Sequence, residues 1–140
     1  MHMTLVVVGS TPVTWISKCQ AAVATSTYSA EFCTMRLATE EAITIQYMIC
    51  SLGIPVNEPT KLFGDNLGVI QNASMPEATL QKKYTAISFH RVRECVAAKI
   101  IEPHKIDGKD NVADIFTKPV DGTTFKYHVW DLMWKTRTSQ

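Results

Sequence analysis

The sequence predicts a mixed α/β sheet with helices packed on it, and two observations support this fold class. The first 18 residues contain two β-branched runs, 4–8 and 13–16, separated by the turn residues 9–12. From about residue 27 onward, segments with helical periodicity alternate with short apolar segments. An opening hairpin followed by alternating helices and strands is typical of one α/β domain.

Length and composition limit the class of protein. The chain has 140 residues, of which 46% are hydrophobic, so it can bury a core and is too apolar for a disordered chain. No apolar run approaches the roughly 20 residues of a membrane-spanning helix, and the run 5–8 is too short for a signal peptide. A formal charge of +1 argues against binding nucleic acid by overall charge but leaves a local basic patch open. We therefore expect an intracellular domain with no membrane partner.

The next elements follow from local signals. Residues 21–25 are β-branched and predict a further strand, and residues 27–52 carry apolar side chains at three- and four-residue steps. Gly53 and Pro55 end that helix. Up to residue 106 we predict a strand at 60–64, a helix at 67–73, a helix at 84–99 and an edge strand at 100–106 that contains Pro103. A turn at 107–110 follows, then a helix from about 112 that Asn111 or Asp110 caps, and a tail helix at 121–134.

The positions of the cysteines and tryptophans predict buried core residues rather than metal-binding or nucleic-acid-binding sites. The four cysteines include no Cys-x-x-Cys pair and so predict no zinc site. Three cysteines lie in predicted helices, where we expect buried thiols: Cys33, Cys50 and Cys95. Trp15 lies in a hairpin strand, while Trp130 and Trp134 are four residues apart in the tail helix, and we expect all three in the core.

Three acids occupy positions where carboxylates can converge. Asp65 follows a predicted strand, and Glu31 and Asp114 lie in the first turns of predicted helices. Side chains at the carboxyl ends of strands face the crevice in which open α/β sheets place their sites. Converging carboxylates can hold divalent cations, and two such cations can activate water against a phosphodiester. Each acid alone also has a structural explanation, because first-turn acids favour the helix dipole and an Asp-Asn pair can form a turn or cap.

Five segments carry a family resemblance, and they occur in one order between residues 5 and 120. They read PVTWISKCQ (12–20), TSTYSAEF (25–32), FGDN (63–66), HRVRE (90–94) and ADIFTKP (113–119). Together they resemble the ribonuclease H domain of copia-type retrotransposon polyproteins, which forms the C-terminal part of the reverse transcriptase and ribonuclease H region.

This resemblance implies an enzyme that cuts the RNA strand of an RNA–DNA hybrid with four acids and two Mg²⁺ ions, with Mn²⁺ as a possible substitute. Glu31, Asp65 and Asp114 match the second, third and fourth acids of the family, as catalytic residues and metal ligands. The implied partners are the hybrid and the remainder of a reverse transcriptase polyprotein. The implied location is intracellular, in a cytoplasmic retrotransposon particle or in the nucleus.

The first acid of the family has no counterpart here, because residues 1–30 contain no Asp or Glu. In the family that acid lies on a first strand, between the hairpin and the strand that leads to Asp65. The resemblance therefore implies a ribonuclease H-like mixed sheet without its first strand, formed by residues 1–120, and a C-terminal helix and tail at 121–140. Two functions stay open: hydrolysis of the hybrid, or a catalytically dead remnant that only binds nucleic acid or serves in assembly.

Contacts to nucleic acid have their own candidates. Lys82 and Lys83 precede the helix predicted from residue 84 and are the best candidates for phosphate contacts. The resemblance makes Asn66 a candidate for contact with a 2′-hydroxyl or phosphate. It also makes His104 the nearest candidate for the histidine that related enzymes use in product release. In the family a basic-His pair is common where this chain has Lys83-Tyr84.

Overall fold

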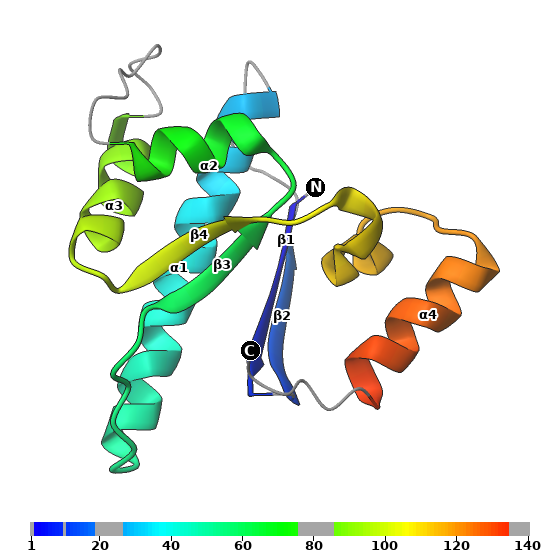
Figure 1. Ribbon diagram of the computed structural model, residues 1–140, viewed down its shortest axis with the longest axis horizontal. Coiled ribbons are helices and arrows are strands. Elements are labelled where there is room, and N and C mark those ends of the chain that lie inside the picture. The colour runs from blue at the N-terminus through cyan, green and yellow to red at the C-terminus, as the bar shows by residue number, and fades with distance from the viewer. Residues whose placement is uncertain (1, 10, 19–26, 76–85, 135–140) are drawn as a thin grey trace.

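The computed structural model describes residues 2–9, 11–18, 27–75 and 86–134 and confirms the mixed α/β class (Figure 1). The predicted strand at 21–25 lies outside the described residues. In chain order the elements are β1 (His2–Val8), β2 (Thr11–Lys18), α1 (Thr27–Ser51), β3 (Thr60–Gly64), α2 (Leu67–Ser74), α3 (Ala86–Ala97), β4 (Ile101–Lys105), the 3-10 turns η2 (Gly108–Asp110) and η3 (Val112–Phe116), and α4 (Gly122–Met133).

The strands form two separate two-stranded ladders. β1 pairs with β2 in an antiparallel hairpin that places Leu5 opposite Trp15, and β3 pairs with β4 in parallel, with Leu62 opposite Pro103. Among the described residues no strand pairing joins the two ladders, so β1 and β3 each keep one unpaired edge. β4 likewise pairs with β3 alone, which agrees with the edge position that Pro103 predicts.

The core lies between the helices and one face of the β3–β4 ladder. Phe32 on α1 is fully buried, and its ring centroid lies 5.5 Å from that of Phe89 on α3 and 5.4 Å from that of Tyr28. Leu62 and Ile101 cover the same cluster from the strands. Burial of these apolar side chains holds α1, α3 and β3 together and thereby fixes the start of α1 beside the end of β3.

Two polar contacts tie α1 to its neighbours farther along the helix. The Gln46 side-chain amide donates to Thr60 Oγ1 at 2.7 Å and to the Ile100 carbonyl oxygen at 3.0 Å. Arg91 on α3 donates from Nε to Glu40 Oε1 at 3.2 Å. The first contact fixes α1 against the beginning of β3, and the second fixes it against α3.

The prediction that three tryptophans lie in the core is wrong. Trp15, Trp130 and Trp134 are 61%, 55% and 71% exposed. Trp15 belongs to the exposed face of β2. The buried residue of α4 is His128, whereas Phe125, Tyr127 and Trp130 on the same helix are exposed. Cys50 is also exposed and Cys33 is only half-buried, contrary to prediction, whereas Cys95 is buried as expected.

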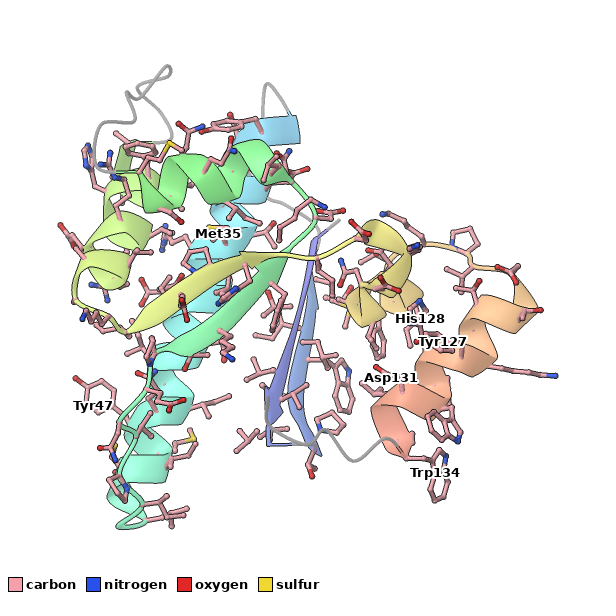
Figure 2. All side chains as sticks on the ribbon, in the orientation of Figure 1. Met35, Tyr47, Tyr127, His128, Asp131 and Trp134 are labelled. Atoms are coloured by element: carbon pink, nitrogen blue, oxygen red, sulfur yellow. The ribbon has the colours of Figure 1, made fainter. Side chains whose placement is uncertain are left out.

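Apolar side chains are also exposed around the end of α1. Tyr47, Met48 and Leu52 are exposed there, and Figure 2 shows Tyr47 pointing away from the rest of the molecule. None of the described helices combines the length and the apolar character that crossing a membrane requires.

Candidate functional site

Three different elements carry the predicted acids. Asp65 directly follows β3, and Asp114 lies in the first turn of η3, both as predicted. Glu31 differs from the prediction, since α1 begins at Thr27 and its first turn contains no acid. Because the helix dipole acts mainly on the first turn, that structural explanation does not account for Glu31.

Asn66 joins Glu31 to the start of α2. Asn66 Oδ1 accepts hydrogen bonds from the backbone N–H groups of Gly68 at 2.9 Å and Val69 at 3.3 Å, which caps the helix. The Asn66 side chain also forms a hydrogen bond with Glu31, in which the amide group donates because a carboxylate can only accept. One side chain therefore fixes both the start of α2 and the Glu31 carboxylate.

The Glu31 carboxyl group lies in an unfavourable environment for a charge. Burial raises its pKa above the usual value, the negative charge of Asp65 raises it further, and the hydrogen bond from Asn66 opposes both effects. Its second oxygen, Oε2, is buried and has no hydrogen-bond partner among the described residues. No cation among the described residues therefore offsets the negative charge of the Glu31 carboxylate.

Replacing Glu31 by glutamine is expected to stabilise the fold at neutral pH by less than about 1 kcal/mol, since the group is partly exposed. Folding raises the pKa of Glu31, so the wild-type chain loses stability as the pH rises through that pKa. Glutamine has no charge and removes this loss, while its carbonyl oxygen keeps the hydrogen bond from Asn66. Urea unfolding at several pH values measures the difference, which shrinks as the pH falls to the ordinary glutamate pKa. Glu58→Gln, at an exposed position, is the control. A Glu31→Gln difference that does not vary with pH contradicts the prediction.

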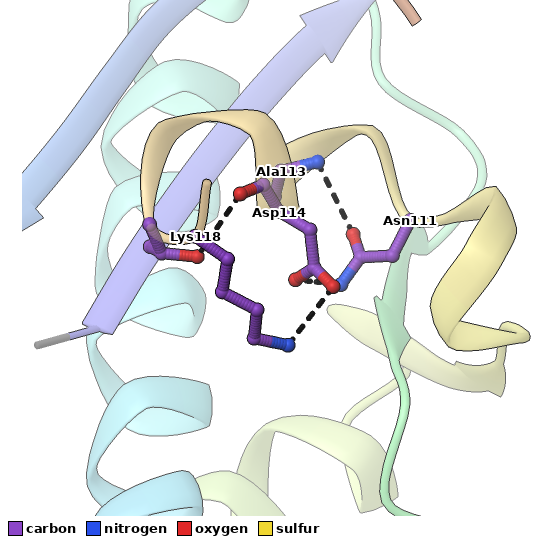
Figure 3. Close-up of polar contacts among 5 residues, drawn as sticks. Asn111, Ala113, Asp114 and Lys118 are labelled. Atoms are coloured by element: carbon purple, nitrogen blue, oxygen red, sulfur yellow. Dashed lines mark hydrogen bonds and ion pairs between the residues drawn. The ribbon is translucent and has the colours of Figure 1, made fainter. Parts of the chain in front are cut away.

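Both carboxylate oxygens of Asp114 are already engaged (Figure 3). Asn111 caps η3 through Oδ1, which accepts from Ala113 N at 3.2 Å, and its Nδ2 donates to Asp114 Oδ1 at 3.3 Å. Lys118 Nζ donates to Asp114 Oδ2 at 3.0 Å. This bond and the charge of Asp114 raise the pKa of Lys118, and the charge of Asp65 adds to the effect. Asp65 therefore lies within electrostatic reach of both Glu31 and Lys118.

The structure thus links the three acids, but it does not gather them into a ligand set. The charge of Asp65 acts on Glu31 and on Lys118, the lysine paired with Asp114. No group of three acidic, histidine or cysteine side chains in the described part of the chain could hold a metal ion. These residues on their own do not fit the expected Mg²⁺ ions, so metal binding stays a prediction.

Three further residues were predicted to contact substrate or product, and the structure describes only one of them, His104. His104 lies on β4 opposite Phe63, with ring centroids 5.6 Å apart and its Nε2 atom 3.2 Å from Glu102 Oε2. Its contacts are therefore with the exposed face of the β3–β4 ladder. Two predicted phosphate contacts lie outside the described residues: Lys82 and Lys83.

Sequence reasoning missed Lys118 as part of the site, although a signal existed. Lys118 follows Asp114 by four residues, the spacing at which opposite charges on a helical turn pair. Of the two residues predicted to cap this segment, Asn111 and Asp110, the structure shows Asn111 as the cap. What the sequence does not show is that Asp65, far away in the chain, acts on the same lysine.

Comparison with known proteins gives relatives among plant transposons. The chain is 29% identical over 122 residues to the retrovirus-related Pol polyprotein from transposon RE1 of Arabidopsis thaliana and 27% identical over 122 residues to that from transposon RE2 of the same plant. It is 27% identical over 114 residues to the retrovirus-related Pol polyprotein from transposon TNT 1-94 of Nicotiana tabacum.

These alignments cover 87%, 87% and 81% of this chain but only 8% of each relative. No protein-family model matches the chain, and no solved structure matches it significantly. Over most of its length, the chain is therefore similar to a short part of the retrovirus-related Pol polyproteins of plant transposons.

Proposed function

We propose that this chain is the ribonuclease H-like part of a retrotransposon polyprotein and that its acids serve hydrolysis of the RNA strand of an RNA–DNA hybrid. The main support is Asp65, whose charge acts on Glu31 and on Lys118, the lysine paired with Asp114. This supports the assignment of the acids from α1, the end of β3 and η3 to one site. The similarity to Pol polyproteins supports the assignment to a retrotransposon polyprotein. The location that we propose with it, a cytoplasmic particle or the nucleus, comes from the family resemblance alone.

Hydrolysis with Mg²⁺ or Mn²⁺ needs a further carboxylate, because the described residues do not form a metal-ligand group. The two ladders indicate where it would enter. β1 and β3 each have an unpaired edge, both contact α1, and they run in opposite directions (Figure 1). One added strand can therefore pair antiparallel to β1 and parallel to β3. We propose that a strand of the polyprotein carrying the first acid fills this position.

A specific observation favours a second candidate function. The carboxylates are not grouped for a cation, and one of them is paired with Lys118. A catalytically dead remnant with an assembly role, or one that binds hybrids through its basic side chains, is compatible with this arrangement. Binding of that kind is expected to weaken steeply with salt, because it depends on phosphate neutralisation.

Cleavage of a labelled RNA–DNA hybrid in Mg²⁺ or Mn²⁺ tests the proposal. We expect hybrid-specific cleavage when a strand that carries the further carboxylate is joined to the chain. In that longer chain Asp65→Asn is expected to lose at least about 100-fold, the order of magnitude for removing a group that stabilises charge in a transition state. Asp107→Asn is the matched control, since Asp107 is exposed and pairs with Lys105. Its cleavage rate is expected to stay unchanged.

Each outcome distinguishes the two functions. Equal cleavage by wild type and Asp65→Asn contradicts a role for the three acids. Salt-sensitive hybrid binding by a folded chain without cleavage supports the binding remnant. Cleavage that appears only when the preceding polyprotein segment is joined to the chain supports completion of the sheet by an added strand.

A further inference from the structure

One face of α4, called its outer face below, carries large apolar side chains that no described element covers. Four of them are each exposed over more than half of their surface: Tyr127, Trp130, Met133 and Trp134. α4 packs against η3 and β2, its buried residue His128 lies on the opposite face, and the hairpin lies between α4 and α1 (Figure 1). A contiguous apolar patch on a surface helix marks an interaction site.

The exposed positions of the outer face are symmetric about Trp130. Between residues 126 and 134 the exposed residues are Lys126, Tyr127, Trp130, Met133 and Trp134, and all others are buried or half-buried. Counted from Trp130, they lie three and four residues away in both directions, so they form one stripe along the helix. A second copy of α4, placed antiparallel with a two-fold axis at Trp130, therefore presents an exposed residue opposite each exposed residue.

The side chains that face each other in such a pair also match in chemistry. Lys126 faces Trp134 of the second copy, and an ammonium group is attracted to the face of an indole ring. Tyr127 faces Met133 of the second copy, whose sulfur makes favourable contacts with aromatic rings, and the two Trp130 rings meet at the axis. Lys126 is exposed and forms no ion pair with another described residue, so its charge is available for this contact.

The outer face is also large enough for a specific dimer. Full burial of a large aromatic side chain removes about 150–250 Å² from water, and more than half of each of the four apolar side chains is exposed. The face therefore offers about 500 Å² of apolar surface, so two copies bury about 1,000 Å² together, the lower limit for a specific interface. Because interfaces near this limit form weak, reversible complexes, we expect a dissociation constant in the micromolar range.

We propose that α4 is a homodimer interface, in which the outer faces of two copies pair antiparallel about a two-fold axis at Trp130. The interface is isologous, so each contact away from the axis occurs twice. A second copy is favoured over a different partner because the symmetric pattern and the match of Lys126 with Trp134 both relate this face to itself. The dimer does not depend on hydrolysis of a hybrid.

Sedimentation equilibrium over a range of micromolar concentrations tests the interface, and wild type is expected to dimerise reversibly. Trp130→Glu places two like charges at the axis and is expected to weaken the dimer at least about thirtyfold, the loss at a central aromatic residue of an interface. Ile87→Glu is the matched control, because Ile87 on α3 is 78% exposed and the substitution makes the same change in charge. It is expected to keep the wild-type affinity. Circular dichroism of each variant shows that the compared chains are folded.

A double variant tests the antiparallel register. Lys126→Gln is expected to weaken the dimer about five- to thirtyfold, because two cation–π contacts are lost. In a Trp134→Ala chain the same substitution is expected to have no further effect. Within one chain the two residues are separated by about 12 Å along the helix, which is too far for a cation–π contact. Coupling between them can therefore arise only between two copies.

The other outcomes are as informative. A wild-type chain that stays monomeric, or an equal loss in Trp130→Glu and Ile87→Glu, overturns the proposal. Additive losses in the double variant overturn the antiparallel register. If the chain dimerises alone but not when the preceding polyprotein segment is joined to it, that segment occupies the face, and the proposal of a second copy is wrong.

This test fails separately from the test of the proposed function. If wild type dimerises through α4 and no form of the chain cleaves a hybrid, the interface stands and hydrolysis does not. If a monomeric chain cleaves the hybrid, hydrolysis stands and the interface does not.

Discussion

Phe32→Ala is expected to lower the free energy of unfolding by about 3–5 kcal/mol, the range for truncating a fully buried phenylalanine. Phe32 is completely buried, and its ring contacts those of Tyr28 on the same helix and Phe89 on α3. Alanine would leave a cavity between two helices that close packing cannot fill without moving one of them. A domain of this size has about 5–15 kcal/mol of stability in total, so this loss is a large share of it.

Urea unfolding followed by far-ultraviolet circular dichroism measures the loss. Tyr47→Ala is the control on the same helix, because Tyr47 is 72% exposed and its truncation is expected to change stability by about 0.5 kcal/mol or less. Phe32→Leu keeps most of the volume and gives a measurable value if the alanine variant does not fold. Equal losses in Phe32→Ala and Tyr47→Ala would contradict the position assigned to the core.

Most elements of the fold could be predicted because their signals are local. The predicted strand at 60–64 coincides with β3, and the helix predicted at 27–52 differs from α1 by one residue. Helical spacing followed by Gly53 and Pro55 is a property of neighbouring residues, so no long-range contact is needed to recognise it. The same holds for Asn66 and Asn111 as helix caps.

Burial could not be predicted where it depends on what covers a surface. Trp15 alternates with Ile16 on β2, and each face of that strand carries both apolar and polar residues in sequence. Trp130 and Trp134 share a helix face, but their spacing does not say whether another element lies against it. The described part of the chain leaves all three largely exposed.

The acids of the site could be predicted from the sequence, but the cation that pairs with one of them, Lys118, could not. Asp65 and Asp114 were found from strand and helix ends, while the action of Asp65 on Lys118 depends on how segments far apart in the chain are placed in space. The expectation of Glu31 in a first helical turn failed although the start of α1 was predicted, because Glu31 is the fifth residue of a helix that begins at Thr27. The unpaired edges of β1 and β3 could be expected from the resemblance alone, since no local signal marks a missing neighbour.

Asn66→Ala is expected to cost about 1 kcal/mol through loss of the α2 cap, with about 0.5–2 kcal/mol as the range for such caps. It also removes the hydrogen bond that opposes the raised pKa of Glu31. Without that bond the pKa of Glu31 rises further, so the variant loses more stability as the pH increases through it. The loss relative to wild type is therefore expected to be larger at pH 7 than at pH 5, as measured by urea unfolding.

Two further variants separate the cap from the contact with Glu31. Asn66→Asp keeps an oxygen that can accept from Gly68 N and Val69 N, but it loses the donor and places a third carboxylate beside Glu31 and Asp65. We expect it to be close to wild type at low pH and destabilised at neutral pH, whereas Asn66→Ala is destabilised at both. Asn72→Ala removes an amide that bonds within α2 and is not its cap, and it serves as the control.

The comparison decides whether one residue couples helix formation to the position of an acid. If Asn66→Ala loses the same stability at both pH values, Asn66 is a helix cap and its bond to Glu31 has no measurable effect. If Asn66→Asp is destabilised equally at both pH values, the cap depends on the amide itself and the charge of Glu31 does not contribute. The expected pattern, a cap loss at every pH with an added loss at neutral pH, links the stability of α2 to the Glu31 carboxylate. A substitution of Asn66 would then change both the helix cap and the contact with the acid, because Asn66 Oδ1 accepts from the start of α2 while its amide group donates to Glu31.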